Sequence, residues 1–135
     1  MMDEMILEGN QELPSVVLDA TLGRFEIEGK ALSENCGTLF TDVISWLEEY
    51  SKAPNAVTRF QFKLDYFNIT SSKRILNILF VLEEMAKSGY DVAIDWWYHN
   101  NDDKMYEVGH DFATMVNLPF NFNEIRSVEL EPALG

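Results

Sequence analysis

The sequence predicts an α/β fold, in which one domain holds a mixed, mostly parallel sheet of about five strands and three main helices, in the order ββαβαβαβ. Two observations predict it. Short runs that alternate apolar and polar residues, as strands with one buried face do, are separated by segments with apolar residues at helical spacing. A helix between two strands returns the chain to the end where it started, so those strands run parallel.

The N-terminal segment, 1–14, is mostly polar and is predicted to form a flexible arm, so we expect the domain to span 15–131. Two β-rich runs follow, at 15–21 and 24–30. The Leu-Gly pair between them predicts a hairpin that begins the sheet.

The remaining elements follow from periodicity and from the residues that end each run. A Lys-Ala-Pro-Asn sequence ends the first helix, and Ser88-Gly89 ends the second, because glycine readily terminates helices. The predicted elements are a helix at 35–53, a strand at 57–67, a helix from 68–72 to 87, a strand at 91–99, a helix that begins at 101–103 and a strand at 120–130.

Alternation in the two central strands predicts which side chains are buried. In the strand at 91–99, Trp96 is predicted to point into the core and Trp97 to point away from it. The Trp97 face is therefore either an exposed protein-docking surface or a face that further helices cover. In the strand at 57–67 the predicted buried residues are Phe60, Phe62, Leu64 and Tyr66.

Acidic residues dominate the charge, since 23 Asp and Glu against 10 Lys and Arg give a formal net charge of −13. Such a chain repels phosphate backbones and anionic lipids, which makes nucleic acids and membranes poor partners, and it favours docking to a basic protein surface. The N-terminus lacks the basic residues of a secretory signal, and the single cysteine, Cys36, forbids an intramolecular disulfide. We therefore expect a cytoplasmic protein.

No catalytic or cofactor motif is found in the sequence. The only histidines, His99 and His110, and the lone Cys36 do not have zinc-site spacing, and no phosphate-binding glycine motif is present. Cys36 has no histidine near it in sequence, so a packed side chain is the simpler interpretation. We expect no catalysis, no metal and no cofactor.

Hydroxyl residues gather where the strand at 57–67 meets the next helix. One hydroxyl suffices to cap a helix, and three are more than capping needs. A phosphate here would meet free N–H groups and the positive end of the helix dipole, and two basic side chains follow. The pattern predicts either simple capping or a phosphorylation switch. The segment consists of Asn68, Ile69, Thr70, Ser71, Ser72, Lys73 and Arg74.

A set of short segments carries a family resemblance, namely 25–29, 33–35, 46–50, 64–68, 70–73, 82–84, 97–98, 102–103 and 119–120. Together they resemble the SiaC family of bacterial regulatory phosphoproteins, over about 15–126. The most specific parts are the Tyr-x-Asn junction with its hydroxyls and the Trp-Tyr pair. More remotely, the order of elements is similar to that of STAS domains, the anti-sigma-factor antagonists.

The resemblance implies a place in a partner-switching pathway. Members of the family are phosphorylated by a dedicated serine/threonine kinase and dephosphorylated by a PP2C-like phosphatase. The unphosphorylated form binds and activates a diguanylate cyclase, which links the switch to cyclic-di-GMP and biofilm formation. The partners expected for this chain are therefore a kinase, a phosphatase and a cyclase.

The family pattern also points to the modified residue. In it the acceptor hydroxyl follows the asparagine directly, and a lysine follows at the spacing of Lys73 from Asn68. Here Ile69 occupies the acceptor position and cannot be phosphorylated. We take Thr70 as the acceptor, with Ser71 and Ser72 as alternatives. The expected partner-binding residues are Asn68, Thr70, Ser71, Lys73, Arg74 and Trp97.

Two other interpretations stay open at this point. This homologue has lost the switch and binds its partner constitutively, or it is a STAS-like module that senses a small molecule or lipid without phosphorylation. The second alternative predicts an apolar pocket lined by residues such as Trp97 and Phe112.

Overall fold

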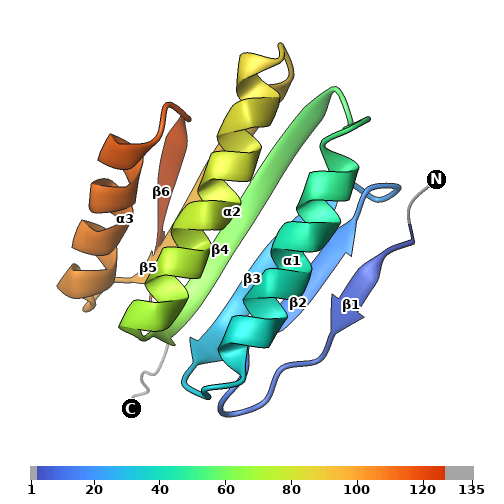
Figure 1. The fold of residues 1–135 in the computed structure, drawn as a ribbon. Helices are drawn as coiled ribbons and strands as arrows, with labels where there is room; N and C mark the ends of the chain where they lie inside the picture. Colours follow the sequence, from blue (N-terminus) through green and yellow to red (C-terminus); the bar gives the residue numbers. More distant parts are fainter. Residues whose placement is uncertain (1–2, 127–135) are drawn as a thin grey trace.

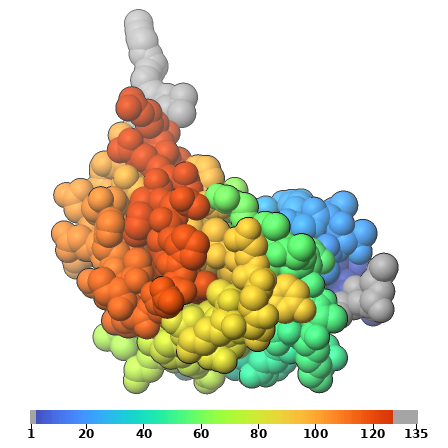
Figure 2. Space-filling model, turned by 90° about the horizontal axis from the view of Figure 1, so that it is seen from above, coloured from blue at the N-terminus to red at the C-terminus, as the bar shows by residue number. Residues whose placement is uncertain are grey.

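Six strands form one sheet in the order β1-β2-β3-β4-β5-β6, and three helices pack on one of its faces (Figure 1). The computed structural model describes residues 3–126. Seen from above, the α2 segment lies between α1 and the α3–β6 side (Figure 2). The elements are β1 (Met5–Leu7), β2 (Ser15–Asp19), β3 (Arg24–Ala31), α1 (Cys36–Tyr50), β4 (Val57–Phe67), α2 (Ile69–Lys87), β5 (Asp91–His99), α3 (Asp103–Met115) and β6 (Phe120–Ile125).

The predicted α/β fold class is confirmed. Strands β3 to β6 pair in parallel, while β1 and β2 pair antiparallel. Because each parallel strand ends at the same edge of the sheet, the helices that follow β3, β4 and β5 all begin there. This carboxyl edge therefore collects the N-termini of α1, α2 and α3. None of the helices in residues 3–126 is long and apolar enough to cross a membrane.

Strand β1 was not predicted from the sequence. Strand β1 lies within the predicted arm, where Met5 pairs with Leu18 and Leu7 pairs with Val16. The Trp46 indole N–H on α1 also donates to the Asp3 carbonyl at 2.9 Å. Three residues are too few to show an alternating pattern, so only the pairing with β2 reveals this strand. The C-terminal part of the predicted strand 120–130, and the domain end at 131, lie outside the described residues.

A bulge in β4 corrects the predicted side-chain directions at its end. Gly29 pairs with Leu64 but the next residue, Lys30, pairs with Tyr66, so Asp65 is left without a partner in β3. The extra residue shifts the alternation by one position. Phe67 therefore packs against the buried Trp96 and Phe112, whereas Tyr66, predicted to be buried, is exposed.

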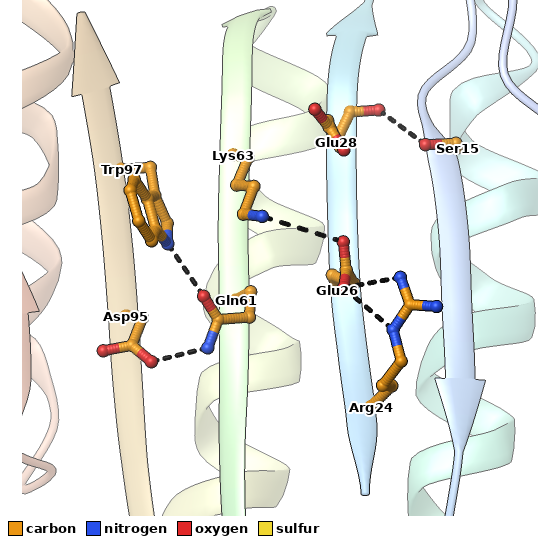
Figure 3. A network of polar contacts seen from close by, with 8 residues as sticks. All are labelled: Ser15, Arg24, Glu26, Glu28, Gln61, Lys63, Asp95 and Trp97. Carbon is orange, nitrogen blue, oxygen red and sulfur yellow. Dashed lines mark hydrogen bonds and ion pairs between the residues drawn. The ribbon is translucent and has the colours of Figure 1, made fainter. Parts of the chain in front are cut away.

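The face of the sheet opposite the helices carries a network of polar side chains (Figure 3). Asp95 is buried there, and its carboxylate accepts hydrogen bonds from the Arg59 guanidinium at 2.7 and 3.1 Å and from the Gln61 amide at 2.5 Å. The Trp97 indole N–H donates to the same Gln61 at 2.8 Å, and the Lys63 ammonium lies 5.1 Å from the Trp97 ring centre. No described helix covers this face. Of the two possibilities for the Trp97 face, a cover of further helices is therefore wrong for the described part of the chain.

Candidate functional site

The candidate site is the first turn of α2, directly after β4. Asn68 has extended backbone angles (φ −87°, ψ 177°), and its side-chain oxygen accepts a hydrogen bond from the Ser71 N–H at 2.8 Å. This is an N-cap, which satisfies one of the N–H groups that a helix leaves free at its start. The cap is thus made by the asparagine, and none of the three hydroxyls is needed for it.

The three hydroxyls of the first turn have different surroundings. Thr70 is exposed to solvent. Ser71 is only 2% exposed, and its hydroxyl has no hydrogen-bond partner within residues 3–126. Ser72 donates its hydroxyl to the Ile69 carbonyl at 2.7 Å. Only Thr70 therefore combines an accessible hydroxyl with no competing bond to the helix.

Two hollows flank this turn, and Asn68 lines both. A polar hollow of about 350 Å³ lies on the α1 side and holds Thr70. An apolar hollow of about 330 Å³ lies on the α3 side and is bordered by Ile69. The polar hollow is lined by Ser33, Glu34, Cys36, Gly37, Asn68, Thr70 and Ser71. The apolar hollow is lined by Phe67, Asn68, Ile69, Ser72, Val108, Asp111, Phe112 and Met115.

The apolar hollow was not predicted, because its walls come from two helices that are distant in sequence. Its exposed rim is unusual: Ile69 is 79% exposed and Met115 is 53% exposed. Exposed apolar side chains beside a hollow are typical of binding surfaces. One feature of the sequence could have indicated this hollow: Ile69, at the family's acceptor position, is an apolar residue at the start of a predicted helix, where side chains are usually exposed.

The structure brings most of the predicted site residues together, since Asn68, Thr70, Ser71, Lys73 and Arg74 all lie on the first turns of α2. Neither basic side chain forms an ion pair with any residue in the described part of the chain.

Trp97 is not part of this group. It lies on the polar face of the sheet, with its indole bonded to Gln61. The predicted pocket shared by Trp97 and Phe112 is therefore wrong. Alternation along β5 puts Trp97 on the face opposite Trp96, and it is Trp96 that packs against Phe112.

Cys36 lines the polar hollow together with two of the acceptor candidates, Thr70 and Ser71. Burial is the main factor that raises the pKa of its thiol, and the nearby Glu12 carboxylate acts in the same direction. The thiol therefore stays protonated at neutral pH and is a poor nucleophile. Within residues 3–126, no three His, Cys, Asp or Glu side chains come together as a metal site requires.

The two helix caps give a matched test of the site's geometry. Replacing Asn68 with Ala should lower the free energy of unfolding by about 1 kcal/mol, because the Ser71 N–H loses its acceptor. Asn35 stands at the same position before α1 but makes no side-chain cap bond, so Asn35→Ala should change little. Urea unfolding of both variants measures the difference. Equal losses would contradict the assignment of Asn68 as the cap.

The comparisons with known proteins agree with this architecture. A family model described as SiaC family regulatory phosphoprotein matches residues 7–125. A Pseudomonas aeruginosa protein (strain UCBPP-PA14), described as uncharacterised, is 29% identical over 119 residues, which cover 88% of this chain and 94% of that protein.

Solved structures extend the similarity to three dimensions. The crystal structure of apo-SiaC from P. aeruginosa has a TM-score of 0.83 at 28% identity, covering 90% of this chain and 99% of that one. A crystal structure of the diguanylate cyclase SiaD in complex with its activator SiaC, from the same species, has a TM-score of 0.84 at 27% identity, with coverage of 90% and 99%. The family match spans β1 to β6, and from it we conclude that the chain belongs to the SiaC family of regulatory phosphoproteins and is a regulator rather than an enzyme.

Proposed function

We propose that the chain is a phosphorylation-controlled activator of a diguanylate cyclase. Its unmodified form binds and activates the cyclase, a serine/threonine kinase phosphorylates Thr70 and so ends binding, and a PP2C-like phosphatase restores the unmodified form. Family membership and the P. aeruginosa complex of SiaD with its activator SiaC support this role. The observation that carries it in this chain is the exposed, unbonded hydroxyl of Thr70 at the start of α2.

Access to the hydroxyl favours Thr70 over the other candidates. A kinase must reach the oxygen that attacks the γ-phosphate of ATP. Ser71 is buried, so its modification would require the first turn to open, and Ser72 would first lose its bond to the Ile69 carbonyl. Ile69 has no hydroxyl. Thr70 therefore takes over the acceptor role one residue beyond the family position.

The cyclase contact is proposed to cover the first turn of α2 together with the apolar hollow. Ile69 and Met115 supply the apolar centre of such a contact, and Asn68, Thr70 and Lys73 supply its polar border. Interfaces of this kind derive most of their affinity from a few apolar anchors that fill pockets, while the rim excludes water. The net charge of −13 favours a basic surface on the partner.

Phosphate mapping tests this proposal. The purified protein is incubated with ATP and a lysate of its native host, and the phosphorylated residues are mapped by tandem mass spectrometry. We expect a single phosphate on Thr70 and none in a Thr70→Val variant, which keeps the side-chain shape without the hydroxyl. If the first turn of α2 stays unmodified while a known family member becomes phosphorylated in parallel, the switch is absent here and the chain binds constitutively.

The apolar hollow also favours a second candidate function, the binding of a small apolar molecule or lipid chain. Its volume of about 330 Å³ is within the range of small-molecule sites. A thermal-shift screen detects such a ligand, because a molecule that binds only the folded state raises the melting temperature. A Thr70→Asp variant separates the two functions, since it weakens cyclase binding in the first and leaves ligand binding almost unchanged in the second.

A further inference from the structure

We propose that the polar hollow between α1 and α2 receives the phosphate of Thr70, and that the Ser71 hydroxyl and the N–H of Gly37 hold it there. This inference rests on the proposed phosphorylation of Thr70. It adds that the hollow binds the phosphate of the modified state, so that the phosphate links the N-terminus of α1 to the N-terminus of α2 through hydrogen bonds.

The Ser71 hydroxyl is the first observation. Ser71 lines the hollow beside Thr70 and is only 2% exposed. Its hydroxyl has no hydrogen-bond partner within residues 3–126. A buried hydroxyl without a partner is unfavourable, so such groups in native proteins call for an explanation. A phosphate oxygen on the neighbouring residue would supply the missing acceptor.

The start of α1 is the second observation, on the opposite wall of the hollow. Asn35, at the cap position, has helical backbone angles (φ −73°, ψ −6°), makes no side-chain cap bond, and no acidic residue follows in the first turn. The N–H of Gly37 has no acceptor among residues 3–126. A side chain built on Gly37 would meet no atom within 4 Å, so an incoming group has open space beside it. Free N–H groups at a helix start favour a phosphate.

The charges around the hollow explain why only a tethered phosphate would occupy it. Glu34 lines the same hollow and repels free anions, while the Cys36 thiol, with its pKa raised by burial, adds no charge at neutral pH. Lys73 and Arg74, three and four residues beyond Thr70 on α2, are the nearest cations in the sequence of that helix, and neither forms an ion pair with a described residue. A covalent link raises the effective concentration of the phosphate enough to overcome one opposing carboxylate.

The experiment uses full-length protein with phosphothreonine installed at position 70 during translation, so the result does not depend on any kinase. In the wild-type background, phosphothreonine should raise the melting temperature by about 4 °C or more, because it satisfies donors at two helix starts. In Ser71→Ala and in Gly37→Pro, which removes the N–H, most of that rise should be lost. Gly37→Ala keeps the N–H and should retain the rise.

Two further measurements make the result specific. Without phosphate, Ser71→Ala should melt at the same temperature as wild type or higher, because it only removes an unsatisfied buried hydroxyl. In ³¹P NMR, the second pKa of the phosphate, ordinarily about 6, should fall in the wild type and return towards 6 in Ser71→Ala. Charge neutralisation in Glu34→Gln should lower that pKa further. If Gly37→Pro fails to fold, the comparison of wild type with Ser71→Ala decides the test.

A rise in melting temperature that persists in Ser71→Ala, or a phosphate pKa equal in wild type and Ser71→Ala, would overturn the inference. Neither outcome affects the proposed switch, which depends on whether the kinase modifies Thr70. Conversely, an unmodified Thr70 in the host lysate would refute the switch and leave these measurements standing.

Discussion

Phosphorylation of Thr70 should lower the affinity for the cyclase by on the order of 100-fold. The cyclase contact is proposed to cover the first turn of α2. A phosphate there must lose water from its remaining oxygens, those that the Ser71 hydroxyl and the Gly37 N–H do not contact. Leaving a charge buried without full compensation costs about 3 kcal/mol or more, and each factor of ten in affinity corresponds to about 1.4 kcal/mol. Titration calorimetry with phosphorylated and unmodified protein measures the ratio.

A charge elsewhere on the surface controls for the change in net charge. Ser45 is exposed on α1, so Ser45→Glu adds a negative charge away from the proposed contact. It should change the affinity less than threefold at physiological salt, by the small size of exposed charge effects, roughly 0–1 kcal/mol. Similar losses for phosphorylated Thr70 and for Ser45→Glu would mean that net charge governs binding, and the proposed contact would be wrong.

Replacing Ile69 with Ser should weaken cyclase binding by at least about 10-fold while leaving the fold intact. Burying an isoleucine contributes about 1.5–3 kcal/mol, and this side chain is 79% exposed in the free protein, so its burial is available to a partner. Stability should be almost unchanged, because little buried surface is lost. Binding is measured by calorimetry and stability by urea unfolding.

Leu22 provides the matched control. It is 69% exposed in the turn between β2 and β3, so Leu22→Ser removes a comparable apolar side chain at a distance from α2. That variant should bind the cyclase like wild type. The proposed contact surface fails if Ile69→Ser binds normally, or if both variants lose affinity to the same extent.

The sequence predicted the first turn of α2 as a candidate site but did not distinguish among its hydroxyls. Consecutive helical residues point about 100° apart, so Thr70, Ser71 and Ser72 face different surroundings even though they are adjacent. Only the packing of α1 and α3 on either side decides that Thr70 is exposed and Ser71 buried. The burial of Ser71, on which the phosphate hollow depends, could not be read from the residue type.

The same holds for the fold: features set by local sequence patterns were predicted, and features set by contacts with distant segments were not. The alternation of apolar residues predicted β4 and β5, and with them the parallel sheet, because that pattern belongs to the strands themselves. The bulge at Asp65 and the three-residue strand β1 depend on pairing with a neighbouring strand, and neither leaves a local pattern. The apolar hollow likewise combines Ile69 of α2 with Met115 of α3.

The rate of cyclic-di-GMP synthesis tests the central claim most directly. The diguanylate cyclases of the host are purified and assayed alone, with the unmodified chain, and with the chain carrying phosphothreonine at position 70. The account predicts that one cyclase is activated by the unmodified chain and that the phosphorylated chain leaves its rate at the basal level. Equal activation by both forms, or no activation of any host cyclase, would contradict it.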